Sequence, residues 1–138
     1  MTTAREIMTE GAEYAKDREP VSDVARRLSQ ADIGLVPVCD DNGRLSGVIS
    51  DRDIVVKVVA EGLDPKTTQA RQLLDQREVV TIGADDDLGE VLRTMEEHRV
   101  RRLPVIDGRQ LVGMLAQADL AGRVSEKDFS RLLEVISS

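Results

Sequence analysis

The chain contains one sequence pattern twice. The stretch from Val24 to Val38 returns 67 positions later as Val91 to Val105, and Gly47 to Ile54 returns 66 positions later as Gly113 to Leu120. The one-residue difference falls in the turn between the two blocks, where insertions are tolerated. A unit this short cannot bury its own apolar face, so two tandem copies are expected to pack as two halves on one core. Any pocket between the halves would then come in two related versions.

Each copy is expected to form a strand, a helix, two strands joined by a turn, and a second helix. Apolar residues recur at helical spacing from about Pro20 to Ala31 in the first copy, and from Leu88 to Met95 in the second. Apolar runs on either side of Asn-Gly or Asp-Gly turn residues predict strands at 36–39, 45–49, 103–106 and 111–115. The predicted fold class is α/β, of the α+β kind, with tandem βαββα repeats related by a pseudo-two-fold axis.

A single module is expected over residues 1–138. We place the first repeat at 8–62, the second at 73–124, and a C-terminal helix at 125–138. The last helix opens with a capping-box pattern at Ser125. Four of its residues are expected to be buried: Phe129, Leu132, Leu133 and Ile136.

The composition excludes several classes of function. Hydrophobic residues make up 41% and charged residues 33% of the chain, which is typical of globular proteins. No apolar run approaches the ~18 residues of a membrane span. A net charge of −7 opposes a nucleic-acid backbone. Because no leader sequence is recognisable, we expect a cytoplasmic protein with neither a nucleic-acid nor a membrane partner.

Enzymatic and metal-binding interpretations find little support. One cysteine and one histidine cannot supply a Cys/His metal-ligand spacing, so we expect no metal site. Cys39 lies in an apolar strand and is interpreted as a buried thiol. His98 ends an amphipathic helix, where a surface role is favoured over general-base chemistry. No Walker loop or dinucleotide-binding glycine motif is present, and we expect no enzyme activity.

The segment from Ile54 to Ala60 is apolar on almost every side. Its position between Ser50 and Gly62 predicts a helix. A helix that is apolar all round needs burial on more than one face. In so small a module the second face is expected to meet another chain, so the sequence predicts a homodimer.

Tandem βαββα copies, each with an apolar-Pro-Val strand and a following Gly-x-x-(Ser/Thr)-x-x-Asp block, resemble the cystathionine β-synthase (CBS) domain pair, or Bateman module. The likeness rests on Val36-Pro37-Val38, on Leu103-Pro104-Val105 and on the block from Gly47 to Asp53, and it covers nearly the whole chain. It implies two clefts between the copies. Members of the family commonly bind adenosine-containing ligands there, such as AMP, ATP, NAD(H) or S-adenosylmethionine.

Ser50 and Asp53 are the main candidates for ligand binding. Asp53 lies in the first turn of a helix whose free N–H groups and partial positive charge suit a phosphate. Its carboxylate can accept hydrogen bonds from both ribose hydroxyls. The same spacing is also a helix capping box, in which both side chains only satisfy backbone N–H groups. Asp119 recurs without a serine, since Ala116 cannot cap, and this recurrence together with the family likeness favours the nucleotide site.

The two copies differ in a way that predicts one competent site and one weak or empty site. The resemblance places basic residues, here Arg101 and Arg102, where they reach across to the phosphates of a ligand held by the first copy. Adjacent residues on a regular strand point to opposite faces, so either the backbone is irregular there or one arginine is solvated. The second site is built on Asp119 and Ala116, with Arg52 as its plausible cation.

The adenine base would be held mainly by aliphatic surface. Ile33, Val36 and Val38, with backbone groups at Pro37, are the candidates, and Tyr14 is the one aromatic residue nearby. The expected function is a regulatory module that requires no cofactor, binds an adenine nucleotide (AMP, ATP or ADP) and signals to a partner protein in trans. The alternative is a CBS-fold structural or protein-interaction dimer without significant nucleotide affinity.

Overall fold

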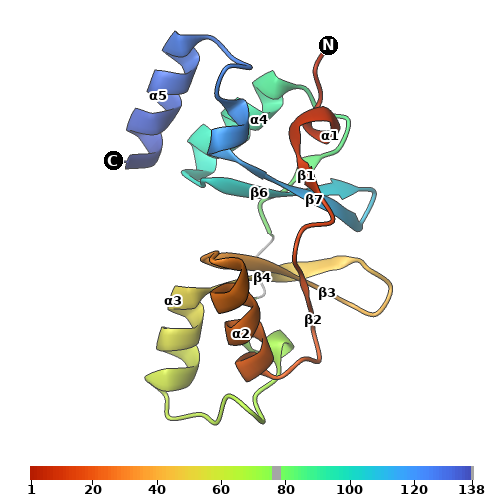
Figure 1. The fold of residues 1–138 in the computed structure, drawn as a ribbon, viewed down its shortest axis with the longest axis vertical. Helices are drawn as coiled ribbons and strands as arrows, with labels where there is room; N and C mark the ends of the chain where they lie inside the picture. Colours follow the sequence, from red (N-terminus) through yellow and green to blue (C-terminus); the bar gives the residue numbers. More distant parts are fainter. Residues whose placement is uncertain (76–78, 138) are drawn as a thin grey trace. The chain divides into compact units, whose positions relative to one another are not determined.

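The computed structural model describes residues 1–75 and 79–137. The chain divides into two compact units, each containing one copy of the repeat. The repeat-one unit is Glu13–Val79, and the repeat-two unit combines Met1–Ala12 with Val80–Ser138. In both units the helices pack on one face of a sheet (Figure 1). The predicted mixed fold with two repeats is confirmed.

The elements of the repeat-one unit are β2 (Ala15–Lys16), α2 (Val21–Ala31), β3 (Leu35–Cys39), β4 (Leu45–Ser50), α3 (Asp51–Ile54), the π-helical segment η1 (Val55–Val59) and the 3₁₀ turn η2 (Ala70–Leu73). The strand order is β2-β3-β4, with β2 parallel to β3 and β4 antiparallel to it. Helices α2 and α3 lie on the same face of this sheet (Figure 1). The direct passage from β4 into α3 places a strand end and a helix start at one point.

The elements of the repeat-two unit are α1 (Ala4–Ile7), β1 (Thr9–Glu10), β5 (Ile82–Gly83), α4 (Leu88–His98), β6 (Arg102–Asp107), β7 (Gln110–Ala116), the 3₁₀ turn η3 (Gln117–Leu120) and α5 (Glu126–Ser137). The strand order is β1-β7-β6-β5. As in the first unit, the two long strands are antiparallel and the short strand β5 is parallel to its neighbour. The repeat is therefore visible in the register as well as in the sequence.

The two long helices form for the reasons that the sequence suggested. In α2, Val21, Val24 and Leu28 form the predicted buried stripe. In α4, the Asp87 side chain caps the helix by accepting a hydrogen bond from the Glu90 N–H at 2.9 Å. Each helix ends at a residue in the left-handed conformation, which stops it in the same way in both copies.

The leading segment of each repeat, residues 1–12 for repeat one and η2 for repeat two, packs in the unit that contains the other repeat. The Ala4 N–H donates to the Asp86 carbonyl at 2.8 Å, and at the equivalent place the Ala70 N–H donates to the Glu19 carbonyl at 2.8 Å. Residues 1–12 therefore belong to the repeat-two unit, although repeat one follows them in the chain. Nothing in the hydrophobic pattern indicated this exchange.

The buried apolar residues form two clusters, one in each unit. The expectation of one shared core is wrong, because each sheet buries an apolar face against its own helices and the exchanged leading segment. Val36 and Ile49 are among the fully buried residues of the repeat-one cluster, and Leu103 and Leu115 are their equivalents in repeat two.

The helical segment at Ile54 to Ala60 is apolar, but only one of its sides is buried within the chain. Val58 is fully buried, whereas Val55, Val56 and Val59 are 57%, 45% and 68% exposed. One face of this segment therefore packs on the repeat-one core, and the other presents valines at the surface of the chain.

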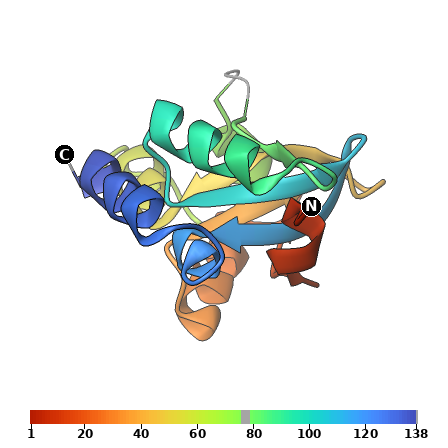
Figure 2. The same cartoon turned by 90° about the horizontal axis from the view of Figure 1, so that it is seen from above.

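The second copy does not repeat that helix. It has the single 3₁₀ turn η3, and α5 supplies the longer helix of the unit, lying beside α4 (Figure 2). An ion pair at 3.1 Å between Arg131 and Glu96 joins α5 to α4. Leu132 is fully buried as predicted, but the expected burial of Leu133 is wrong, since its side chain faces outward and is 38% exposed. No helix within the described residues is both long and apolar enough to span a membrane.

Candidate ligand-binding site

Ser50 and Asp53 lie where β4 passes into α3. The Ser50 N–H donates to Asp53 Oδ2 at 2.8 Å, and the Asp53 N–H donates to Ser50 Oγ at 3.0 Å. This reciprocal pair is a complete capping box. One of the two alternatives left open by the sequence, capping, is thus present. It occupies only one carboxylate oxygen, since Oδ1 of Asp53 accepts no hydrogen bond from the backbone of residues 1–75 and 79–137. The side chain is 30% exposed.

The start of α3 offers no free backbone donor to an anion. The N–H groups of Asp51, Arg52 and Asp53 donate to the Gly34 carbonyl at 3.0 Å, to Asp51 Oδ1 at 2.8 Å and to Ser50 Oγ at 3.0 Å. The expectation of free N–H groups at this helix start is wrong, because two side chains and the Gly34 carbonyl, just before β3, accept their hydrogen bonds. A phosphate at this point would have to be bound by hydroxyl and cationic side chains.

Within the described residues, Lys57 is the cation that pairs with Asp53. Its Nζ lies 3.6 Å from Asp53 Oδ1, donates a hydrogen bond to the Leu73 carbonyl at 2.8 Å and to Asp75 Oδ1 at 3.1 Å. Our sequence reasoning did not include this residue. The four-residue spacing between Asp53 and Lys57, typical of helical ion pairs, is the signal that could have found it.

The equivalent turn in repeat two keeps half of the capping box. The Ala116 N–H donates to Asp119 Oδ2 at 2.8 Å, but alanine has no oxygen to accept in return. The argument that Asp119 recurs for a reason other than capping is therefore weakened, because its carboxylate satisfies the backbone as Asp53 does.

Arg101 and Arg102 border this second turn within their own repeat. Arg102 is the first residue of β6 and pairs across the ladder with Ala116, and the Arg101 carbonyl accepts a hydrogen bond from the Gln117 N–H at 2.8 Å. Both side chains are exposed, and within the described residues neither forms an ion pair. Arg101 lies outside the strand, so strand alternation does not dictate where its side chain points. Both guanidinium groups are available to an anion.

The remaining candidates differ in how much surface they offer. Val36 is fully buried in the repeat-one core, and Ile33 is partly buried against that core. Pro37, the next residue of β3, is also buried, and its side chain is on the opposite face of the strand from that of Val36. Tyr14, just before β2, is 43% exposed. Arg52 is exposed, next to the capping box.

Two residues with possible chemistry are placed where they are inert. Cys39 is buried at the end of β3, and desolvation, with smaller contributions from Asp40 and Asp17, raises its pKa to about 11. The thiol is therefore protonated at neutral pH and a poor nucleophile. His98 is the last residue of α4 and is exposed.

The sequence model of the CBS domain matches residues 4–60 and again residues 70–126. The chain belongs to the CBS domain family. Both matches begin at the first residue of a leading segment, Ala4 of α1 and Ala70 of η2, so the CBS repeat includes the segment that is exchanged between the units. CBS domains are generally regulatory rather than enzymatic modules, and the match indicates a protein of that kind.

Relatives of known sequence match most or all of the chain. Hypoxic response protein 1 of Mycobacterium tuberculosis (strain ATCC 25618 / H37Rv) is 40% identical over 138 residues, covering 100% of this chain and 96% of that protein. CBS domain-containing protein YhcV of Bacillus subtilis (strain 168) is 30% identical over 121 residues, covering 88% of this chain and 84% of that protein.

Solved CBS structures agree with this fold. The crystal structure of Hypoxic Response Protein I with two coordinated zinc ions matches with a TM-score of 0.81 and 41% identity, over 90% of this chain and 100% of that chain. A hexameric CBS-CP12 protein from bloom-forming cyanobacteria matches with a TM-score of 0.69 and 26% identity, over 95% of this chain and 74% of that chain. In the described part of the present CBS pair, no three His, Cys, Asp or Glu side chains are grouped in a way that could hold a metal ion.

Proposed function

We propose that this CBS pair is a regulatory module that binds an adenine nucleotide, AMP, ADP or ATP, through Asp53. The observation that carries the proposal is the Asp53 carboxylate, which is fixed to the backbone through Oδ2 while Oδ1 lies 3.6 Å from Lys57 Nζ and the side chain is 30% exposed. A carboxylate held in this way is ready to accept hydrogen bonds from a ribose diol without further ordering. Membership of the CBS family, whose pairs commonly bind nucleotides, supports the same conclusion.

The phosphate would be bound by side chains. The Ser50 hydroxyl accepts from the Asp53 N–H and keeps its own hydrogen to donate to a phosphate oxygen. Arg101 and Arg102 are exposed and free of ion pairs within the described residues, and guanidinium groups bind phosphate with two N–H donors each. We propose that they complete the Asp53 site, and that the Asp119 site, with Ala116 and Arg52, is weak or empty. Ile33, Tyr14 and the backbone near Pro37 would contact the base.

Titration calorimetry with AMP, ADP and ATP tests this assignment. Wild type is expected to bind one nucleotide per chain. Asp53→Asn keeps an oxygen for the Ser50 N–H but removes the charge, so affinity should fall while the melting temperature changes little. Arg101→Ala with Arg102→Ala should weaken ATP more than AMP, because ATP carries more phosphate. Two equivalent sites per chain would contradict the proposed asymmetry.

A second candidate function is a CBS-fold scaffold that mediates protein contacts without nucleotide affinity. The complete capping box favours it, because Ser50 and Asp53 already have a structural role. A thermal-shift screen separates the two candidates. A ligand at about 100 times its dissociation constant adds about 2.7 kcal/mol of stability. No shift with AMP, ADP, ATP, NADH or S-adenosylmethionine would favour the scaffold.

We also propose a homodimer formed through the valine surface at Val55, Val56 and Val59. These side chains form an exposed apolar face on one helical segment, and the hexameric state of the CBS-CP12 protein supports self-association. Light scattering at micromolar concentration should give twice the chain mass for wild type. Val59→Asp should give a monomer, and the matched exposed change Leu133→Asp should leave the dimer intact.

The proposal includes a cytoplasmic location and a separate effector protein that senses nucleotide occupancy. No nucleic acid or membrane takes part. Cell fractionation checks the location, and nucleotide-dependent co-purification with a single protein would identify the effector.

A further inference from the structure

Three oxygen atoms of the repeat-one unit lie close to the ammonium group of Lys57, one from α3 and two from the stretch Leu73–Asp75. The Leu73 carbonyl and Asp75 Oδ1 accept hydrogen bonds from Nζ at 2.8 and 3.1 Å, and Asp53 Oδ1 lies 3.6 Å away. The first two distances are hydrogen bonds, whereas the third is a contact between charges. The Lys57 side chain is only 32% exposed, so water screens these contacts incompletely.

The backbone that carries Lys57 is unusual. Lys57 lies in the π-helical segment η1, where the Ala60 N–H reaches back to the Val55 carbonyl at 2.9 Å. π-Helical turns are rare and occur frequently at functional positions. In this one, Val58 is fully buried while its neighbour Lys57 contacts both Asp53 and the chain beyond η2.

The partners of Lys57 at Leu73 and Asp75 lie near the end of the repeat-one unit. We call residues Leu73–Asp75 the exit segment, because the repeat-two unit resumes at Val80. Lys57 therefore joins the proposed ligand-binding carboxylate to the stretch of chain that leads to the other repeat.

We infer that Lys57 is a positioning residue that transmits nucleotide occupancy at Asp53 to the exit segment. The inference rests on the proposed function, since it needs a ligand that donates hydrogen bonds to Asp53. Ribose hydroxyls that donate to Oδ1 neutralise part of the charge that attracts Lys57. The ammonium group then pairs more completely with Asp75 and the Leu73 carbonyl, and the exit segment is held more firmly when nucleotide is bound.

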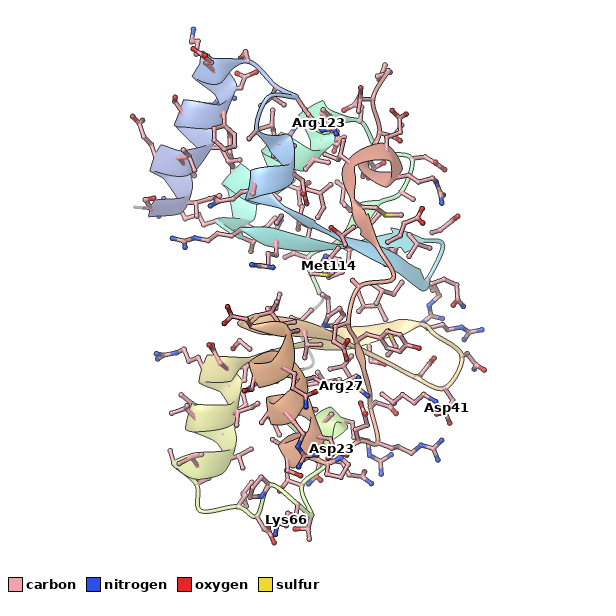
Figure 3. The ribbon with its side chains drawn as sticks, in the orientation of Figure 1. Asp23, Arg27, Asp41, Lys66, Met114 and Arg123 are labelled. Carbon is pink, nitrogen blue, oxygen red and sulfur yellow. The ribbon has the colours of Figure 1, made fainter. Side chains whose placement is uncertain are left out.

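Amide hydrogen exchange measured by NMR tests this inference, read at Leu74, whose N–H donates to the Arg71 carbonyl. Without ligand, Lys57→Met should speed exchange there about three- to tenfold, because one hydrogen bond and one ion pair are lost. Asp75→Asn should speed it less. The matched control is Lys66→Met, since Lys66 is exposed in the loop away from β4 and forms no ion pair within the described residues (Figure 3).

With the tightest-binding of AMP, ADP and ATP, exchange at Leu74 should slow about two- to fivefold in wild type and in Lys66→Met. It should not slow in Lys57→Met with the site saturated. Lys57→Arg, which keeps the charge, should restore part of the response. Saturation without slowing in wild type, or equal slowing in Lys57→Met, overturns the inference while leaving the proposed function intact. Absence of binding by any of the three nucleotides overturns the proposed function and removes the inference with it.

Discussion

The turn at Ser50–Asp53 in repeat one and the turn at Ala116–Asp119 in repeat two share one feature and differ in the rest. In both, the aspartate accepts a hydrogen bond of 2.8 Å from the N–H that ends the strand. Within the described residues, only the first has a serine hydroxyl, a helix that continues beyond one turn, and a cation that pairs with its carboxylate. The shared feature satisfies the backbone, so the features found in repeat one alone are the better guide to ligand binding.

The two repeats also differ just beyond this turn. In repeat two η3 ends at Leu120, and Gly122, which takes the place of Val56, lies two residues farther on with φ of 75°. Arg123, the counterpart of Lys57, therefore lies beyond the turn, and in the described part of the chain it makes no ion pair with Asp119 (Figure 3). A similar cation in the sequence thus has a different position in space.

The largest expected effect breaks the comparison at the two aspartates. Asp53→Ala should weaken nucleotide binding by roughly two to three powers of ten, since charge-assisted hydrogen bonds to both ribose hydroxyls are lost. Asp119→Ala should leave calorimetric affinity unchanged. Equal losses in the two variants would show that both turns bind ligand.

The next effect concerns the backbone just after η3. Gly122→Ala should destabilise the protein by about 1–2 kcal/mol, because a side chain strains the left-handed conformation. A Cβ atom at position 122 would have no other atom within 4 Å, so the loss of stability comes from the backbone conformation alone. Val56→Ala, at the helical counterpart in repeat one, is the control and should change stability little. Urea unfolding measures both, and an unchanged Gly122→Ala would contradict the argument.

The capping boxes predict effects of opposite sign in the two repeats. Ser50→Ala removes the acceptor for the Asp53 N–H and should cost about 1 kcal/mol. Ala116→Ser supplies the missing oxygen for the Asp119 N–H and should stabilise by about 0.5 kcal/mol. Thermal unfolding distinguishes these outcomes. A destabilising Ala116→Ser would mean that the 3₁₀ turn cannot adopt the geometry of the full box.

The effect that is smallest at neutral pH is a pH dependence in repeat one. Desolvation raises the pKa of the Cys39 thiol from its ordinary value of 9.0 to about 11. The stability that this protonated thiol contributes is complete below pH 9 and is lost as the pH rises through 11. Cys39→Val should flatten stability between these values, whereas alkylation of the folded wild type at neutral pH should be slow. Rapid alkylation would show that the thiol is accessible.

Much of the fold follows from periodicity. The α2 stripe of Val21, Val24 and Leu28 was predicted because burial of one helix face depends only on spacing. The strands beside Pro37 and Pro104 were predicted with their ends within one residue, since turn residues bound them. The exchange of leading segments was not, because it depends on contacts between residues distant in sequence.

The candidate site was predictable in part. The Ser50–Asp53 spacing indicates both a capping box and a ligand site, and the capping box is present in the structure. The contact of Lys57 with the Leu73 carbonyl involves a backbone atom sixteen positions away, and no side-chain pattern encodes such a bond. The hydrogen bond from the Asp51 N–H at the start of α3 likewise goes to a distant backbone atom, the Gly34 carbonyl.

The exchanged leading segments limit how this protein can be taken apart. A cleavage after Val79 would separate Val80–Ser138 from Met1–Ala12, which supplies β1 and the α1 turn of the same unit. The C-terminal fragment would lack residues 1–12 of its own unit, and the N-terminal fragment would carry them. Folding of the repeat-two unit should therefore require that both fragments be present together.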